Sequence, residues 1–322
     1  MPFRRALCIG SSRMQATDHR TRSPVRRPRI TLHSQRRTRH RGLTVKRRSP
    51  MKSDQPVLEA HHLSKTFSTR SFLGRTTSEN RAVDDVSLSL AAGKTYALVG
   101  ESGSGKSTTG RMLQGLITPT SGHVTVRAAD GSTAVQTTAR ANRDVQMIFQ
   151  DPYSSLNPRR RIRGILEESL RIVGEKDPSV LRTKVDEALN AVGFSDEHAQ
   201  RYPHEFSGGQ RQRIGIARAL VVNPKIIICD EPVSALDVSI QAQILNLLRK
   251  LQADLGLAYL FITHDMSVVR YLSHRVGVMY HGRIVEEANT PDLFAAPQHE
   301  YTKRLLTSVP IHHPSLRTSA KA

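Results

Sequence analysis

The stretch Gly100–Ser107 reads GESGSGKS, which has the pattern G-x-x-x-x-G-K-S, and the residues around it decide the fold. The apolar run Thr95–Val99 before it predicts a short strand, and Met112, Leu113 and Leu116 after it have helical spacing. A strand, a glycine-rich turn and a helix in this order can cradle phosphate. The glycines let successive backbone N–H groups point inward, and the helix N-terminus adds partial positive charge. We therefore predict a nucleoside triphosphate site in an α/β domain.

Two side chains of this loop have a chemical task. Lys106 is placed to reach the β- and γ-phosphates, and the Ser107 hydroxyl is placed to ligate Mg²⁺. The residues expected to line the triphosphate are Gly100, Glu101, Ser102, Gly103, Ser104, Gly105, Lys106, Ser107 and Thr108.

The charge of the chain is unevenly distributed. The 322 residues carry a formal net charge of +20, but residues 1–50 hold 15 Lys and Arg against one acid, which leaves +6 for the rest. The rest is only mildly basic, so the high net charge does not indicate nucleic-acid binding by the folded part. A chain of this length can form one large or two modest domains.

Residues 1–52 are rich in Arg, Ser and Pro and lack hydrophobic periodicity, so they are expected to be a disordered basic tail. Three interpretations stay open: a basic arm for nucleic acid or anionic lipid, an organellar transit peptide, or a segment outside the natural protein. The third is favoured, with Met51 as the true start, because an ordinary-looking sequence begins there just before the first expected strand.

The two cysteines, Cys8 and Cys229, neither form a disulfide framework nor supply four metal ligands, and they fit a reducing compartment. No run of 18 apolar residues is present, so we expect no membrane-spanning segment.

Strands and helices are expected to alternate from Val57 onward, which favours a mostly parallel α/β sheet. A polar loop through Ser68–Asn80 is expected between the first two strands. The residues from Ile162 to about Val222 are expected to be mostly helical and to form an inserted lobe. A later helix is expected to end at Gly256. The expected strands after Val57 are Val57–Leu63, Val86–Leu90, Val124–Val126, Val145–Phe149, Ile226–Asp230, Tyr259–Ile262 and Val276–Tyr280.

Two further motifs could complete the site. The strand Ile226–Asp230 ends in adjacent carboxylates, of which Asp230 can hold Mg²⁺ and Glu231 can accept a proton from an attacking water. Phe206–Gln210 opens another helix. Its Ser207 reads either as a plain N-cap or, with Gly208 and Gly209 exposing bare N–H groups, as part of a second phosphate site. Two copies arranged head-to-tail could then share two nucleotides.

Together these motifs make the chain resemble an ATP-binding cassette (ABC) ATPase from about Val57 to Pro310. The resemblance implies ATP and Mg²⁺ as ligands. It also implies a phosphate-loop (RecA-like) core sheet that is mostly parallel, an antiparallel β subdomain and an inserted α-helical subdomain. It assigns adenine stacking to Phe67, catalytic roles to Glu231, Gln150 and His264, metal ligation to Ser107, Gln150 and Asp230, and nucleotide contacts across the dimer to Ser207, Gly208, Gly209, Gln210 and Asp237.

The stretches Gln150–Arg159, Cys229–Gln243 and Pro291–Pro310 are similar to the ATPases of bacterial dipeptide and oligopeptide importers. This similarity implies an ATPase domain at 53–288, with its helical subdomain at about 151–222, and a C-terminal extension at 289–322. Phe206 stands where leucine is commoner and Glu300 where proline is usual, and the first 50 residues match nothing in the family.

The implied function is ATP hydrolysis that powers uptake of dipeptides, oligopeptides or a similar small solute, such as glutathione or nickel. The implied partners are two transmembrane permease subunits, a second ATPase subunit (a copy or a paralogue) and, indirectly, an extracytoplasmic solute-binding protein, with no nucleic acid. The expected location is peripheral, on the cytoplasmic face of the bacterial inner membrane.

The basic run Arg159–Arg163 is either a solvated face or a docking surface. The alternative, a soluble ABC ATPase acting on nucleic acid or ribosomes, is disfavoured because there is one cassette and Lys106 and Ser207 are only 101 positions apart.

Overall fold

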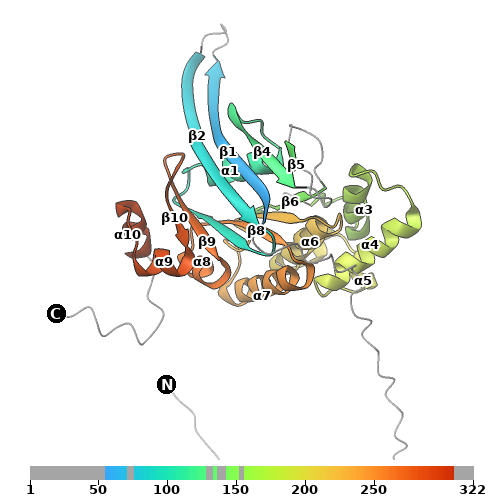
Figure 1. The fold of residues 1–322 in the computed structure, drawn as a ribbon. Coiled ribbons are helices and arrows are strands. Elements are labelled where there is room, and N and C mark those ends of the chain that lie inside the picture. The colour runs from blue at the N-terminus through green and yellow to red at the C-terminus, as the bar shows by residue number, and fades with distance from the viewer. Residues whose placement is uncertain (1–54, 71–75, 128–132, 136–142, 152–155, 308–322) are drawn as a thin grey trace, which may run out of the picture. The chain divides into compact units, whose positions relative to one another are not determined.

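The computed structural model describes residues 55–70, 76–127, 133–135, 143–151 and 156–307. All described residues belong to one compact unit of the chain (Figure 1). The predictions for the tail at 1–52 and for Met51 therefore fall outside the described residues. Among the described helices, none is both long and apolar enough to cross a membrane.

An antiparallel sheet forms the first layer, with strand order β2-β1-β4-β5. Val86, Leu88 and Leu90 are buried and alternate with exposed Ser87 and Ser89, as expected for a sheet with one face toward the core. The strands are β1 (Pro56–Arg70), β2 (Thr76–Ala91), β4 (Ser121–Arg127) and β5 (Thr133–Val135).

The expected polar loop at Ser68–Asn80 is wrong over most of its length. β1 and β2 continue as one long hairpin, in which Phe67 pairs with Asn80 and Ser68 with Glu79 (Figure 1). Backbone pairing needs no apolar side chains where both faces of a ribbon meet water, and Phe67, Ser68, Glu79 and Asn80 are all exposed. The polar composition therefore concealed the extensions of two predicted strands.

The central sheet has the order β10-β9-β3-β8-β7-β6. Every neighbouring pair is parallel except β9 and β10. All residues of β3, β7 and β8 are buried, which explains their continuous apolar sequences. The strands are β3 (Thr95–Val99), β6 (Val145–Ile148), β7 (Ile226–Asp230), β8 (Ala258–Thr263), β9 (Arg275–Tyr280) and β10 (Arg283–Asn289).

The registers bring the carboxyl ends of the central strands to one edge. Val99 of β3 lies beside Thr263 of β8, Asp230 of β7 lies beside Ile262, and Ile148 of β6 lies beside Cys229. Loops that follow parallel strands meet at such an edge, which is where open α/β sheets place their ligands.

Three helices connect or cover these strands. α1 (Lys106–Gln114) ends at Gly115, so Leu116 lies beyond the helix and is 58% exposed, contrary to its expected place in the helical pattern. α7 (Val238–Leu255) ends at Gly256 in the left-handed conformation, as predicted. α6 (Gly208–Leu220) follows Ser207.

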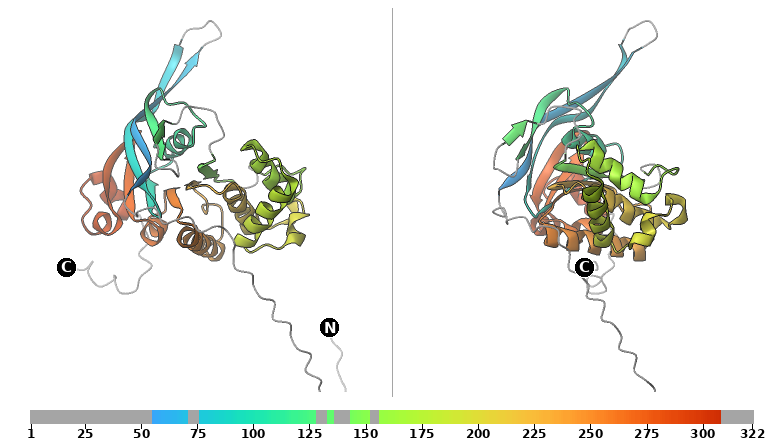
Figure 2. Two further views of the ribbon diagram at one scale, coloured as in Figure 1. Left: turned by 45° about the vertical axis from the view of Figure 1, so that its right-hand side comes forward. Right: turned by 90° about the vertical axis from the view of Figure 1, so that its right-hand side faces the viewer.

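Helices fill the interval between β6 and β7, as predicted: α3 (Ile162–Ile172), α4 (Pro178–Ala191), α5 (Asp196–Ala199), the short 3-10 helix η1 (Pro203–Glu205) and then α6. Figure 2 shows α3, α4 and α5 grouped to one side of the central sheet. The half-buried Arg163 of α3 ties this group together, because its guanidinium donates to Asp186 of α4 at 2.7 Å and also to Asp196 of α5.

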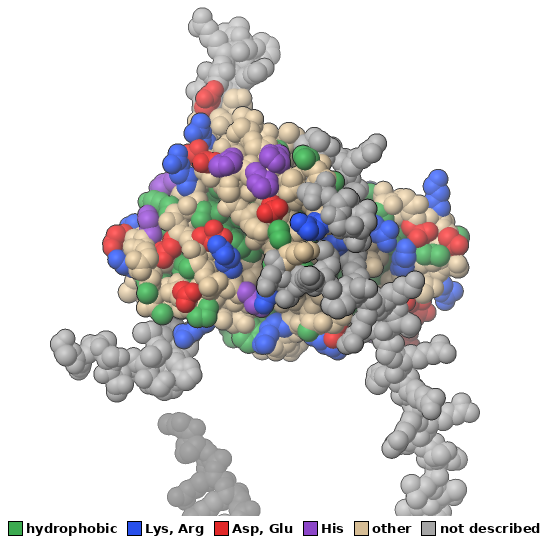
Figure 3. Space-filling model, viewed as in Figure 1, with side chains coloured by type: hydrophobic (Ala, Val, Ile, Leu, Met, Phe, Trp, Pro, Cys, Tyr) green, Lys and Arg blue, Asp and Glu red, His purple; other side chains and the backbone are tan. Residues whose placement is uncertain are grey.

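The C-terminal part packs on the other side, where α8 (Met266–Leu272), α9 (Thr290–Ala295) and α10 (Glu300–Thr307) lie near β9 and β10 (Figure 2). A separate apolar cluster joins these helices to β3 and β9 through Val99, Met266, Val276, Leu293 and Tyr301. On the face drawn in Figure 3, acidic and basic side chains of the described residues are interspersed, in keeping with the small net charge outside residues 1–50.

Candidate functional site

The loop Gly100–Gly105 joins β3 to α1 and encloses the ammonium group of Lys106. Lys106 is only 5% exposed, and its Nζ donates to Gly100 O at 2.7 Å, to Glu101 O at 2.6 Å and to Ser104 Oγ at 3.4 Å. Burial lowers the pKa of Lys106, while the nearby carboxylates of Glu231, Asp230 and Glu101 oppose that shift. The loop therefore concentrates positive charge at the carboxyl edge of the sheet, where a phosphate group would be attracted.

Two glycines of this loop are required by close backbone approaches. Gly105 has φ of 106°, and a Cβ there would lie 2.3 Å from Ala82 O. A Cβ at Gly100 would lie 2.2 Å from Met279 O. The predicted phosphate loop is thus fitted tightly between β2 and β9.

The first candidate metal ligands meet beside this loop. Ser107 Oγ donates to Asp230 Oδ1 at 2.8 Å, which joins the start of α1 to the end of β7. Asp230 is 4% exposed, and burial raises the pKa of its carboxyl against the opposing effects of Ser107 and Arg111. A hydroxyl and a carboxylate are the hard oxygen ligands that Mg²⁺ prefers, so these two residues fit the ion.

Mg²⁺ at this place would need oxygens from the nucleotide as well. The described residues contain no group of three or more His, Cys, Asp and Glu side chains that could hold a metal by themselves. Mg²⁺ is commonly bound by one or two carboxylates together with substrate phosphates and water, so the sparse protein contribution suits that ion. Gln150, the third predicted ligand, makes its hydrogen bond to Glu231 instead.

The three predicted catalytic residues come together around Glu231. Gln150 Nε2 donates to Glu231 Oε2 at 3.2 Å, and His264 Nδ1 lies 3.3 Å from Glu231 Oε1. The Glu231 side chain is 16% exposed, whereas that of His264 is 60% exposed. Glu231 adopts φ of 45°, and its N–H donates to Ile262 O at 3.0 Å, so the start of the turn after β7 is fixed to β8. A non-glycine residue in this region of φ is uncommon and marks a specifically positioned carboxylate.

The Ser207–Gln210 turn satisfies its polar side chains internally. Ser207 Oγ accepts from Gln210 N at 3.4 Å, and Gln210 Oε1 accepts from Ser207 N at 2.9 Å, which forms a capping box. Ser207 is therefore the N-cap of α6, and the second phosphate site at this turn stays a prediction. Among the hydrogen bonds of the described residues, none joins Ser207 or Gln210 to the phosphate loop.

Phe67 and Asp237 lie apart from the convergent cluster. Phe67 is 43% exposed near the end of β1, and the ammonium of Lys65 lies 5.3 Å from its ring centroid. Asp237 is exposed and occupies the N-cap of α7 without a side-chain cap bond. The flat face of Phe67 is suited to stacking and the Asp237 carboxylate can accept hydrogen bonds, but neither is joined to the loop by a recorded contact.

Two contacts of the phosphate loop were missed by the sequence reasoning. Glu101 N donates to the Tyr301 hydroxyl at 2.8 Å, and Gly282 N donates to Ser104 O at 3.0 Å. Tyr301 follows Glu101 by 200 positions, and neither contact belongs to a recognisable spacing pattern. Only the antiparallel return of β10 and the packing of α10 bring these residues to the loop.

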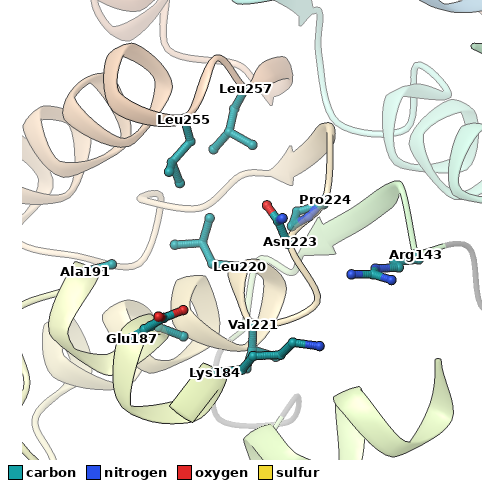
Figure 4. Close-up of a pocket in the computed structure, with 11 residues that line it drawn as sticks. Arg143, Lys184, Glu187, Ala191, Leu220, Val221, Asn223, Pro224, Leu255 and Leu257 are labelled. Atoms are coloured by element: carbon teal, nitrogen blue, oxygen red, sulfur yellow. The ribbon is translucent and has the colours of Figure 1, made fainter. Parts of the chain in front are cut away.

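A pocket of about 260 Å³ between α4 and the ends of α6 and α7 does not share residues with this cluster (Figure 4). Its apolar wall includes Leu220, Leu255 and Leu257. Its two cations have partners, because Lys184 pairs with Glu175 at 2.8 Å and Arg143 donates to Val222 O at 3.0 Å. The pocket is therefore separate from the phosphate-binding groups.

The fold and the cluster define a phosphate-loop nucleotide-binding cassette, with an acidic strand end, a glutamine and a histidine around its loop. Residues 83–234 match the family model described as "ABC transporter". The oligopeptide transport ATP-binding protein OppF of Bacillus subtilis (strain 168) is 50% identical over 263 residues, which cover 81% of this chain and 84% of OppF. The chain belongs to the ABC transporter family, which confirms the resemblance inferred from the motifs.

Other relatives support this assignment. The glutathione import ATP-binding protein GsiA of Escherichia coli (strain K12) is 52% identical over 263 residues, which cover 81% of this chain but 42% of GsiA. The chain thus spans less than half the length of that relative. The ATP-binding cassette MJ0796, in a dimeric structure bound to ADP and Pi, is 28% identical with a TM-score of 0.61, and the match covers 72% of this chain and 98% of that one. The predicted α/β fold class is confirmed.

Proposed function

We propose that this chain is the ATP-hydrolysing subunit of a bacterial import complex that takes up dipeptides, oligopeptides or a similar small solute. The observation that carries the proposal is the meeting of Ser107, Asp230, Gln150, Glu231 and His264 at the carboxyl edge of one parallel sheet. The import function is supported by relatives that are named for oligopeptide transport and glutathione import. Small peptides and glutathione-like compounds are therefore the solutes that we propose for this chain.

ATP binding begins at the phosphate loop. Lys106 keeps its bond to Gly100 O and exchanges those to Glu101 O and Ser104 Oγ for the β- and γ-phosphates, and the helix N-terminus of α1 adds backbone donors. Ser107 and Asp230 would hold Mg²⁺, which would neutralise charge that develops on the phosphate oxygens. Phe67 supplies a ring on which adenine stacks.

Hydrolysis then requires a base beside the γ-phosphate. Glu231 accepts a proton from the attacking water, while Gln150 and His264 hold its two carboxylate oxygens in position. His264 is exposed enough to contact the γ-phosphate itself. Glu231 lies one residue beyond Asp230, so the base and the metal ligand are placed by the same strand.

The second half of each site comes from another polypeptide. Gly208 and Gly209 leave backbone N–H groups at the start of α6, where the helix dipole favours an anion. In a head-to-tail dimer, the γ-phosphate on one loop completes the Ser207–Gln210 turn of the partner, and Asp237 lies at the same junction. ATP then favours the closed dimer more than ADP does, and this differential binding shifts an open–closed equilibrium.

Permease subunits would dock beside Gln150. A hollow of about 290 Å³ between α3 and α6 is lined by Phe149, Ile165, Ile172 and Ala219 as well as polar groups. Ile172 on this surface is 64% exposed, so its apolar side chain is accessible to a partner. We propose that two transmembrane permeases contact this surface, that a solute-binding protein acts through them, and that the chain works on the cytoplasmic face of the inner membrane.

The test replaces the base in the full chain. Glu231→Gln should leave ATP affinity within about twofold and lower turnover by at least about 100-fold, because a positioned base contributes on that order. Glu197→Gln, an exposed site on α5, is the matched control and should change neither. Retained turnover in Glu231→Gln would refute the role of the base. Failure of this variant to dimerise in saturating ATP, with its natural partners present, would refute the shared-site mechanism.

A further inference from the structure

Tyr301 connects the C-terminal extension directly to the phosphate loop. It lies on α10, is 2% exposed, and its hydroxyl accepts a hydrogen bond from Glu101 N at 2.8 Å. Tyr301 takes no direct part in the proposed binding or hydrolysis of ATP.

The bonded peptide is the one that also holds the phosphate-loop lysine. The N–H of Glu101 and the C=O of Gly100 belong to the same planar peptide group. Its N–H donates to Tyr301, and its oxygen accepts from Lys106 Nζ at 2.7 Å. Rotation of this plane would break both bonds, so the Tyr301 hydroxyl and the Lys106 ammonium constrain each other's position through one rigid unit.

Tyr301 is itself fixed from several sides. Its N–H donates to His299 Nδ1 at 3.1 Å, and the backbone N–H groups of Gln298 and His299 donate to the Glu286 carboxylate of β10 at 2.8 and 2.9 Å. Its ring lies 4.2 Å from the ring of Tyr280 on β9. This anchoring means that the hydroxyl is presented to the loop by a rigid part of the fold.

The ionisation state of Tyr301 suits this contact. Burial raises the pKa of its phenol, so the hydroxyl stays neutral at physiological pH and the bond from Glu101 N is not replaced by a buried charge. The contact is therefore a constant structural constraint on the loop.

We propose that Tyr301 is a positioning residue of the nucleotide site, through which the C-terminal extension fixes the Gly100–Glu101 peptide and with it the Lys106 ammonium. This inference rests on the proposed binding of ATP at the loop. It predicts that the hydroxyl of Tyr301 contributes to nucleotide affinity although it does not touch the nucleotide.

The test compares Tyr301→Phe with Tyr280→Phe in the full chain. The first removes the hydroxyl that contacts the loop, and the second removes a hydroxyl from the neighbouring ring. We expect Tyr301→Phe to weaken binding of fluorescent ATP by about fivefold, the effect of one lost hydrogen bond. Tyr280→Phe should stay within about twofold. Hydrogen exchange of the Glu101 amide should accelerate in Tyr301→Phe, while the amides of Ala97 and Val99 in β3 keep their protection.

Several results would overturn the inference. Unchanged affinity in Tyr301→Phe would do so, and so would equal losses in both variants or faster exchange throughout β3, since these indicate packing alone. Rapid exchange of the Glu101 amide in the unmodified chain would also contradict it, whether or not Tyr301→Phe folds. If the unmodified chain fails to bind ATP, the proposed function is wrong, which is a distinguishable failure.

Discussion

Two glycine-containing turns of this chain each begin a helix, and they are stabilised in different ways. The turn before α1 is held by distant residues: Asp230 accepts from Ser107, Tyr301 accepts from Glu101, and Gly282 donates to Ser104. The turn before α6 is stabilised locally, by the reciprocal bonds of Ser207 and Gln210. The first is completed within the chain, whereas the second is what we expect of a half-site that another polypeptide completes.

The glycines of the two turns differ in how closely the rest of the chain approaches them. A Cβ at Gly100 or Gly105 would collide with backbone oxygens, and a Cβ at Gly209 would lie 2.4 Å from Ile240 Cγ2 of α7. A Cβ at Gly208 would make only an ordinary contact, 3.8 Å from Leu236 Cδ2. Packing within the chain thus explains three of these four glycines. We infer that glycine is needed at position 208 because a group from outside the chain approaches its backbone closely.

The largest effect is expected from removing the charge inside the first turn. Lys106→Ala should weaken ATP binding by about 100-fold or more, because charge-assisted bonds to the β- and γ-phosphates are lost. The melting temperature without nucleotide should change little, since burial already disfavours this charge. Titration calorimetry with ATP and thermal melting of the free protein provide the two measurements.

Lys94→Ala is the matched control for charge. Lys94 lies just before β3, at the opposite end of this strand from the loop, and is partly exposed, so its replacement removes one positive charge without touching the loop. ATP affinity should stay within about twofold. An equal loss in Lys94→Ala would mean that the general electrostatic field, and not the enclosed ammonium, attracts the nucleotide.

The next effect separates the two glycines of the second turn. Gly208→Ala should lower ATP-dependent dimerisation and turnover by about tenfold. Its stability should be unchanged or up to about 0.5 kcal/mol higher, because alanine is the better helix residue. Gly209→Ala should lose about 1–3 kcal/mol of stability, since α6 must move away from Ile240. Urea unfolding and dimerisation in the Glu231→Gln background measure these quantities.

Opposite outcomes would break the comparison between the turns. A Gly208→Ala protein that dimerises and hydrolyses ATP normally has no partner surface at this glycine. A Gly208→Ala protein that is as unstable as Gly209→Ala would show that the second turn is also held by intramolecular packing.

The sequence predicted the parts of this site that local patterns determine. The strands Thr95–Val99 and Ile226–Asp230 were predicted with their observed bounds, because continuous burial requires continuous apolar residues. The meeting of Gln150, Glu231 and His264 followed from a resemblance, and the parallel registers give its physical reason.

The parts that were missed depend on tertiary contacts. β10 has a mixed polar sequence, since it lies at the sheet edge, and no periodic signal marked it. Tyr301 reads as one aromatic residue in a short polar helix, and only three-dimensional packing places its hydroxyl against Glu101. The polar extension of β1 and β2 was read as a loop because solvent-exposed ribbons need no apolar alternation.

The smallest effect concerns the carboxylate that the first turn holds in a buried place. Burial raises the pKa of Asp230 in the folded state, so the fold favours its protonated form. The stability that this preference adds is present below the unfolded pKa of about 3.9 and is lost as pH rises through the folded pKa. Asp230→Asn, which stays neutral, should therefore be at least as stable as the unmodified chain near neutral pH. That advantage should shrink as the pH falls toward about 4. Its ATP affinity in Mg²⁺ should drop by about fivefold.

Asp84→Asn tests the sign of this argument at a second carboxylate. The hydrogen bond from Arg283 lowers the pKa of Asp84, so ionised Asp84 stabilises the fold above its unfolded pKa, and that contribution is lost as pH falls through the folded pKa. Asp84→Asn should be slightly less stable than the unmodified chain near neutral pH, with its ATP affinity unchanged. Urea unfolding of both variants between about pH 4 and pH 8 gives the comparison. If Asp230→Asn loses stability at neutral pH as Asp84→Asn does, the ionised Asp230 stabilises the first turn. The ionised carboxylate needed to bind a metal would then not destabilise the fold.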